Sequence, residues 1–307
     1  MSSSSVGGLS DRTEATSETE DLMQTVTSTD GTKIAYESAG SGPVVILVNG
    51  ALGDRALDRR FKLMSGLAAL LSPRFTVVNY DRRGRGESGE AGPFSVEREV
   101  EDLAALIEAA GGSASLFGFS SGGALALRAA AAGIGVESLA VYEAPFMVDR
   151  SDKLPAGDYA ERLSELLAAD DRNGAVRQFM SNAIGVPGPV VAAMRLMPAW
   201  RDMKANAHTL PYDWAALGEH NMKGDPIRAA EWAPVTMPAL VVYGAKSPTN
   251  LQKGSRALAE VLPNAELRGL EGMGHRLKVK LLAPVLGEFL AEHSSAVPSG
   301  SPMTALA

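Results

Sequence analysis

A serine stands in the middle of the segment Gly118-Phe119-Ser120-Ser121-Gly122 and could act as a nucleophile. The G-x-S-x-G pattern is typical of a sharp turn between a strand and a helix, which pushes the serine hydroxyl out of the backbone. Larger side chains two residues before and after the serine would collide in such a turn. The pattern alone also arises by chance in glycine-rich proteins. Here an apolar strand is expected at 114–117 and a small-residue helix at 123–132, so the sequence predicts that Ser120 is a nucleophile.

The composition excludes several classes of chemistry. With 307 residues, 45% of them hydrophobic, the chain suits one large domain or a core with a subdomain. It contains no cysteine, which excludes disulfides, thiolate catalysis and cysteine-based metal sites. The net charge of −7 argues against a nucleic-acid partner, and the arginines of 81–89 are interleaved with acidic residues and lack an aromatic platform for bases. We expect no cofactor and no metal ion.

The two ends of the chain are polar and poor in large apolar residues. Residues 1–23 are rich in Ser, Thr, Glu and Gly, and 294–307 in Ser, Pro, Gly and Ala, so we expect both tails to be disordered. The first residues lack the basic and apolar parts of a secretory signal, and no stretch of about 18 apolar residues suggests a membrane span. We therefore expect a cytoplasmic monomer or homodimer that binds a small-molecule substrate, and neither a nucleic acid nor a membrane.

Apolar strands alternate with amphipathic helices over most of the chain. The run at 43–48 is apolar on both faces, which is typical of a central parallel strand. Asp30-Gly31 predicts a hairpin turn between the first two strands. The alternation predicts an α/β fold with a mostly parallel central sheet and helices on both faces. The expected strands are 25–27, 33–36, 43–48, 75–80, 114–117, 138–142, 239–243 and 265–268, and the expected helices are 57–71, 96–110, 123–132, 251–262 and 281–290.

The alternation stops between about residues 146 and 232. This segment favours several helices without a strand and contains many methionine and aromatic side chains. Such an insertion is either a cap over a site or a plain helical subdomain, and part of its apolar set must form its own core. We predict a core made of 24–145 and 233–293, with 146–232 as a helical cap.

Four motifs, in this order, resemble the α/β-hydrolase superfamily over about Thr25 to His293. They are Asn49-Gly50-Ala51 after an apolar strand, the loop Tyr80–Ser88 of the form Tyr-Asp-x-Arg-Gly-x-Gly-x-Ser, the turn at Ser120, and Gly272–His275 of the form Gly-x-x-His. The set is specific to the fold and not to a substrate. Asn49 replaces a histidine that many relatives carry, which should matter little because the family uses this loop mainly through its backbone.

Acyl transfer at a serine needs a base, and His275 is the natural candidate. A serine hydroxyl is a poor nucleophile until a base within hydrogen-bond reach takes its proton. His275 follows the last expected strand, and loops after parallel strands lie at the edge of the sheet that also carries Ser120. The alternative is a structural loop histidine. The resemblance implies that the backbone N–H groups of Ala51 and Ser121 stabilise the developing oxyanion.

The acid of a triad departs from the family's usual pattern. Relatives usually carry an aspartate in the loop after the strand at 240–243, where this chain has Ser247. A minority of the superfamily, including some haloalkane dehalogenases, takes its acid from the end of the preceding strand, which implies Glu143 here. A carboxylate that interrupts an apolar run needs a partner. The alternatives are that Glu143 caps the insertion or pairs with an arginine, that Asp149 is the acid, or that the site is a Ser-His dyad.

The reaction expected from these residues is hydrolysis by a serine hydrolase that cleaves a small to medium apolar ester, thioester or lactone through an acyl-enzyme intermediate. The candidates for its substrate pocket are Phe119, Phe146, Met147, Trp200 and Trp214. A serine nucleophile argues against dehalogenation, which uses aspartate in relatives of this shape. The alternatives are a cofactor-free lyase, cyclase or C–C bond enzyme of secondary metabolism on the same fold, and a non-catalytic ligand-binding member.

Overall fold

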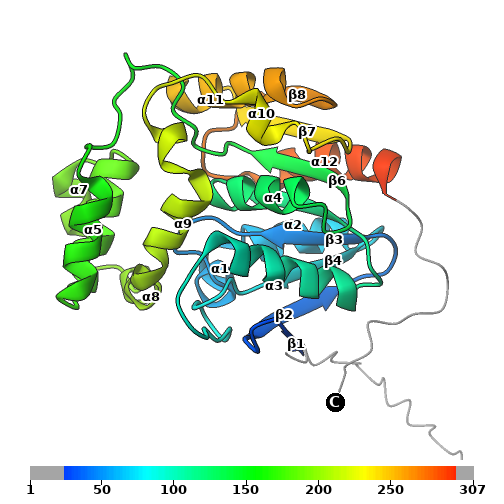
Figure 1. The fold of residues 1–307 in the computed structure, drawn as a ribbon, viewed down its shortest axis with the longest axis horizontal. Helices are drawn as coiled ribbons and strands as arrows, with labels where there is room; N and C mark the ends of the chain where they lie inside the picture. Colours follow the sequence, from blue (N-terminus) through cyan, green and yellow to red (C-terminus); the bar gives the residue numbers. More distant parts are fainter. Residues whose placement is uncertain (1–23, 295–307) are drawn as a thin grey trace, which may run out of the picture.

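The computed structural model of the protein describes residues 24–294 (Figure 1). The predictions of disordered tails concern 1–23 and 294–307, and apart from Ser294 these residues lie outside the described part of the chain. No helix between residues 24 and 294 is long and apolar enough to cross a membrane.

An eight-stranded sheet forms the centre of the described chain. Its strands are β1 (Gln24–Thr27), β2 (Lys33–Ala39), β3 (Val44–Val48), β4 (Thr76–Tyr80), β5 (Ala114–Phe119), β6 (Val136–Tyr142), β7 (Ala239–Gly244) and β8 (Ala265–Leu270). They lie side by side in the order β1-β2-β4-β3-β5-β6-β7-β8. β2 pairs antiparallel with β1 and β4, and the other pairings are parallel. The mostly parallel sheet predicted from the alternation is confirmed.

Helices cover both faces of this sheet, as predicted (Figure 1). The core helices are α1 (Arg55–Phe61), α2 (Met64–Leu71), α3 (Val96–Ala109), α4 (Ser121–Ala131), α11 (Thr249–Val261) and α12 (Val279–His293). On one face α3, α4 and α11 bury side chains such as Leu106, Leu127 and Leu258 against the strands. On the other face α2 and α12 bury Leu67 and Leu286. Both faces of the central strands are therefore shielded from water, which explains their continuous apolar sequence.

The prediction of one helix over 57–71 is wrong, because the structure divides this segment into α1 and α2. α1 ends at Phe61, and the next residue, Lys62, adopts a left-handed φ of +50°. The carboxylate of Asp58 turns back and accepts the backbone N–H groups of residues 63–65, at 2.9, 2.7 and 2.7 Å. Asp58 thus satisfies the free donors at the start of α2 and stabilises the break, although the apolar spacing continues across it.

Residues 146–232, which we call the cap, connect β6 to β7 by helices and turns. These are α5 (Tyr159–Ala168), α6 (Arg172–Gln178), the π-helical turn η1 (Phe179–Ala183), α7 (Gly188–Met194), α8 (Ala199–Ala205), the short 3₁₀ turns η2 (Ala207–Thr209) and η3 (Glu219–Met222), α9 (Leu210–Leu217) and α10 (Ala229–Trp232). Figure 1 shows α5, α7 and α8 grouped at one side of the sheet, with α9 between them and α4. The cap has an apolar cluster of its own that includes Leu163 and Met203 and continues to Leu52, in the loop after β3.

Candidate active site

Ser120 occupies the turn between β5 and α4, in the geometry that the sequence pattern predicts. Its backbone has φ of +56° and ψ of −126°, a conformation that is strained for a residue with a side chain. A Cβ atom at Gly118 would lie 2.5 Å from the Cα of Gly123, and one at Gly122 would lie 2.3 Å from the carbonyl oxygen of Val48. Both flanking glycines are therefore required by close backbone contacts, and the turn can present Ser120 only with glycine at these two places.

A buried carboxylate contacts the candidate base. Nδ1 of His275 lies 2.7 Å from Oε2 of Glu143, and because an ionised carboxylate only accepts hydrogen bonds, Nδ1–H is the donor. The backbone N–H of Gly244 donates to the other oxygen, Oε1, at 2.7 Å. Glu143 follows β6 directly, has a φ of +48° and is 0% exposed. The predicted contact between Glu143 and His275 is thus present, and neither oxygen of this carboxylate is paired with an arginine.

The alternative acid, Asp149, lies away from this pair. It is half-buried and accepts a hydrogen bond from Lys253 Nζ at 2.6 Å, in an ion pair away from His275. Within the described chain, the carboxylate in hydrogen-bond contact with His275 is that of Glu143. The geometry therefore favours Glu143 over Asp149 as the partner of the histidine.

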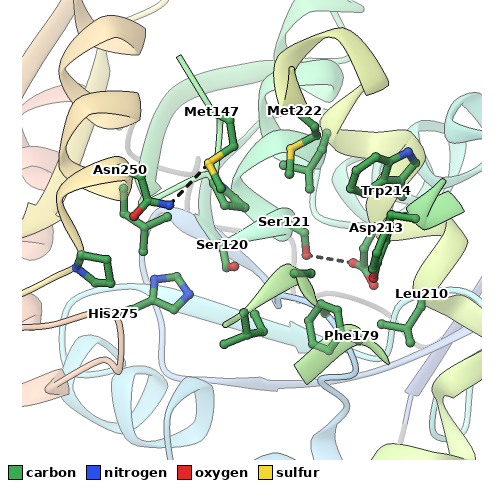
Figure 2. A pocket seen from close by; sticks show the side chains of 18 residues that line it. Ser120, Ser121, Met147, Phe179, Leu210, Asp213, Trp214, Met222, Asn250 and His275 are labelled. Carbon is green, nitrogen blue, oxygen red and sulfur yellow. Dashed lines mark hydrogen bonds between the residues drawn. The ribbon is translucent and has the colours of Figure 1, made fainter. Parts of the chain in front are cut away.

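Contacts around His275 fix its ring. Phe119 stacks on the imidazole, with 5.2 Å between the ring centroids, and the Tyr142 hydroxyl donates to the carbonyl of Gly274 at 2.7 Å. Because Nδ1 is turned to Glu143, Nε2 is the nitrogen that remains for a proton from Ser120. Figure 2 shows the side chains of Ser120 and His275 at one cavity, and both residues line it.

The two residues implied as oxyanion donors, Ala51 and Ser121, line the same cavity. Ser121 is the first residue of α4, where backbone N–H groups have no partner within the helix. Ala51 follows β3 in a turn that approaches the serine closely, since a Cβ atom on Gly50 would lie 3.2 Å from the Cβ of Ser120. The side chain of Asn49 accepts the N–H of Gly50 at 2.8 Å and so stabilises this turn.

The cavity has a volume of about 170 Å³ and a largely apolar wall. Its cap side chains include Tyr159, Phe179, Leu210, Trp214 and Met222. None of Tyr159, Phe179, Leu210 and Met222 was predicted, because apolar periodicity shows that a helix has a buried face but not which buried side chain borders a hollow.

Of the five predicted pocket residues, Met147 and Trp214 line this cavity, whereas Phe119, Phe146 and Trp200 do not. Phe119 stacks instead on the imidazole ring of His275. Phe146 is fully buried against Trp232, with ring centroids 5.9 Å apart. Trp200 belongs to the apolar core of the cap and donates its indole N–H to Asn173 at 2.8 Å. These three side chains pack against neighbouring residues of the site or of the cap. The prediction that they line the cavity is wrong.

Asp213 is the one carboxylate in the described lining, and sequence reasoning missed it. It is 3% exposed, and its Oδ1 accepts from Arg82 Nη1 at 2.6 Å and from Ser121 Oγ at 2.8 Å. Its Oδ2 accepts from Arg85 Nη2 at 2.8 Å. Burial disfavours the charge, but the Arg85 and Arg82 guanidiniums outweigh burial and hold the pKa of Asp213 below its usual range. Asp213 is therefore an ionised and fully partnered group, not a free anion in the pocket.

The arginines of 81–89 serve structure, although mostly through acids outside their own loop. Arg82 also makes a double hydrogen bond to Glu99, and Arg83 makes one to Asp102. This loop contains three arginines and only two acidic residues, which indicates that at least one arginine pairs with an acid from another part of the chain. Nothing in the sequence identified Asp213 as such an acid.

Comparisons with known proteins agree with this fold. The model of the α/β hydrolase family matches residues 45–284. The crystal structure of an α/β hydrolase from Sphaerobacter thermophilus is similar, with a TM-score of 0.79 and 48% sequence identity over 87% of this chain and 100% of that one. A thermophilic esterase from Thermogutta terrifontis has a TM-score of 0.60 at 22% identity, over 89% of this chain and 99% of that one, which shows a shared fold.

Curated relatives match more distantly. An uncharacterized protein of Mycobacterium tuberculosis is 24% identical over 269 residues, which are 80% of this chain and 73% of that protein. An uncharacterized hydrolase of Bacillus subtilis is 36% identical over 101 residues, and this match spans 32% of the chain and only 35% of that relative. The family match over most of the chain and the strand order of the sheet lead to one conclusion: the chain belongs to the α/β hydrolase family.

Proposed function

We propose that this protein is a serine hydrolase that cleaves a small to medium apolar ester, thioester or lactone through an acyl-enzyme intermediate. The observation that carries the proposal is the 2.7 Å contact between His275 and Glu143, at a histidine that shares a cavity with Ser120. A nucleophile, a base and a carboxylate that orients the base are the set that acyl transfer requires.

The proposed reaction starts with attack of Ser120 Oγ on the substrate carbonyl carbon while its proton passes to Nε2 of His275. Glu143 holds the tautomer with Nδ1–H and stabilises the imidazolium. The N–H groups of Ala51 and Ser121 bind the tetrahedral oxyanion. The intermediate expels the alcohol or thiol, which takes the proton from His275, and leaves an acyl group on Ser120. Water, deprotonated by His275, then attacks the carbonyl of this ester. The new tetrahedral intermediate expels Ser120 Oγ, which takes the proton back from His275, and the carboxylic acid is released.

The cavity supports an apolar acyl group of limited size. Its volume of about 170 Å³ is close to the cavity of about 150 Å³ that accepts one benzene ring in another protein. The carboxylate in the wall, Asp213, already accepts from two arginines and Ser121. A charged acyl group would find no unpaired counter-ion among the lining residues and would lose its hydration.

The position of Glu143 also removes the main reason to consider a non-hydrolytic reaction. The lyase, cyclase or C–C bond alternative was supported by the serine at position 247, where relatives carry an aspartate. Because Glu143 supplies a carboxylate to His275 from the neighbouring strand, the serine at 247 does not imply a dyad.

The test is labelling with a fluorophosphonate probe, followed by hydrolysis of p-nitrophenyl acetate, butyrate, octanoate and benzoate. We expect stoichiometric labelling of Ser120, identified by peptide mass spectrometry, and turnover of the short and aromatic esters. Ser120→Ala is the matched control and should show neither. Absence of labelling in a folded wild-type protein, together with no turnover of any ester, would refute the proposal.

A further inference from the structure

Hydrogen bonds connect the segments that carry both proposed oxyanion donors to one side chain of the cap, Asp213. Asp213 lies in α9 and accepts three hydrogen bonds, from Ser121 Oγ, Arg82 and Arg85. Figure 2 shows the Ser121 contact as a dashed line at the wall of the cavity. The two arginines are 0% and 1% exposed, so water cannot hydrate their charges and they need buried counter-ions.

Arg85 holds the peptide group that carries the first proposed donor. Its Nη1 donates to the carbonyl oxygen of Gly50 at 2.8 Å. This carbonyl belongs to the same peptide unit as the N–H of Ala51. Because a trans peptide is planar, with C=O and N–H directed to opposite sides, fixing the Gly50 oxygen fixes the direction of the Ala51 N–H. A charge-assisted bond to the oxygen also polarises the amide and makes its N–H a stronger donor.

Arg82 and Ser121 hold the remaining parts. Arg82 Nη1 donates to the carbonyl of Asn49 at 3.3 Å, one peptide before the unit held by Arg85. Ser121 Oγ donates to Asp213 at 2.8 Å, which fixes the first residue of α4 and with it the second proposed donor. The second serine of the Gly-Phe-Ser-Ser-Gly segment thus has a structural partner in the cap.

We propose that Asp213 is a positioning residue that sets both oxyanion-hole donors through Arg82, Arg85 and Ser121, so that the hole is complete only with α9 of the cap in place. We call these four residues the Asp213 brace. This inference rests on the proposed function, because it concerns the stabilisation of an oxyanion formed at Ser120. The brace contains the ion pairs that join the cap to the loop after β4, and it makes α9 a fixed part of the active site.

Charge balance explains why the anion at 213 is needed. Arg82, Arg85, Glu99 and Asp213 form a buried set of two cations and two anions. Arg82 keeps Glu99 if Asp213 loses its charge, whereas Arg85 would then retain only neutral partners, among them Gly50 and Thr209. A buried cation without a counter-ion is unstable, so Arg85 should move toward water and release the Gly50 carbonyl.

A second ion pair between the cap and the core provides a matched control. Asp202 of α8 accepts from Arg60 of α1 at 2.7 Å, and neither residue belongs to the cavity lining. Asp202→Asn therefore removes a cap–core charge pair without reaching the oxyanion loop. Asp213→Asn removes the charge at the brace with almost no change in volume.

The experiment compares kcat, KM and inhibition by a boronic acid, which forms a tetrahedral adduct at the serine, in wild type, Asp213→Asn and Asp202→Asn. In Asp213→Asn we expect kcat to fall about 10- to 100-fold, somewhat less than when an oxyanion donor is deleted outright. The boronic acid should bind more weakly by a similar factor, while KM changes little, because only the tetrahedral species uses the hole. Asp202→Asn should resemble wild type. A purely structural role would lower the melting temperature without separating the inhibition constant from KM.

Ser121→Ala keeps the proposal open to refutation if Asp213→Asn does not fold. It removes one hydrogen bond of the brace and leaves the backbone N–H of residue 121 and both arginines in place. We expect a smaller fall in kcat with a parallel loss of boronic acid affinity. Unchanged kcat and inhibition in a folded Ser121→Ala or Asp213→Asn would overturn the brace. If wild type itself neither reacts with the fluorophosphonate nor hydrolyses esters, the proposed function fails first, and the two failures are distinguishable.

Discussion

Glu143→Gln tests the proposed triad with almost no change in shape. In the structure Oε2 of Glu143 faces His275 Nδ1, and Oε1 accepts the N–H of Gly244. A glutamine has one oxygen and one NH₂ for these two places. If its oxygen stays with Gly244, the NH₂ donates to Nδ1 and forces the proton onto Nε2, where it blocks the base. If its oxygen faces Nδ1–H, two donors meet at Gly244. The first arrangement gives the wrong tautomer, and the second keeps the reactive tautomer only at the cost of a donor–donor contact at Gly244.

The size of the expected loss in kcat follows from this wrong tautomer and from the burial of residue 143. Glu143 is 0% exposed, so water cannot replace its charge beside the imidazolium. Exchange of the acid for its amide in another triad lowers kcat by about 10⁴, and we expect a loss of about 10² to 10⁴ here. This loss equals about 3 to 5 kcal/mol of activation free energy.

The assay is the initial rate of p-nitrophenyl butyrate hydrolysis, with active sites counted by fluorophosphonate labelling and folding checked by circular dichroism. Ser247→Ala, at the place where relatives carry the acid, is the control and should lose little activity. A Glu143→Gln protein that folds and keeps kcat within about tenfold of wild type would refute the argument, since the histidine would then act without the carboxylate.

Three further predictions address the nucleophile, the pocket and an ion pair of the core. Ser120→Ala should lower ester turnover by several orders of magnitude without changing the melting temperature. A purified Ser120→Ala protein that hydrolyses esters at the wild-type rate would contradict the assignment. Trp214→Ala enlarges the cavity and should raise the ratio of kcat/KM for octanoate over acetate esters, whereas an unchanged ratio would place the acyl chain elsewhere. A hydrogen bond from Arg83 holds the pKa of Asp30 well below its usual range. This pair therefore stabilises the fold above the unfolded pKa of about 3.9, and the stability is lost as the pH falls toward the folded value. Urea titrations of wild type and Asp30→Asn should differ at pH 7 and converge below about pH 4, and a difference independent of pH would exclude this ion pair as its cause.

Features that depend on neighbouring residues could be predicted from the sequence. The turn at Ser120 follows from two glycines whose missing side chains make room for backbone atoms. The parallel sheet follows from apolar runs separated by amphipathic segments. The contact of Glu143 with His275 was also within reach, because residues that follow parallel strands meet at one edge.

Predictions failed where one side chain interrupted a helical pattern, and where buried side chains had to be divided between the cavity wall and the filled core. The apolar spacing of 57–71 is helical throughout, yet the carboxylate of Asp58 ends the first helix and begins the second. Phe146 and Trp200 are apolar, as a pocket wall requires, but the same property buries them in packed clusters. Hydrophobicity indicates that a side chain is removed from water and does not distinguish a cavity wall from a filled core.

Local sequence patterns were enough to predict the strand–turn–helix at Ser120, the alternating architecture, and the candidates for base and acid. Which charged side chains meet depends on the three-dimensional packing of the chain. Arg82 and Asp213 are 131 residues apart in the chain, and Ser121 and Asp213 are 92 apart. A buried charge needs a partner wherever the chain can bring one, and the partner of these arginines comes from a helix whose position is fixed by the packing of the cap. No local pattern encodes that contact, because it depends on how the cap packs against the core.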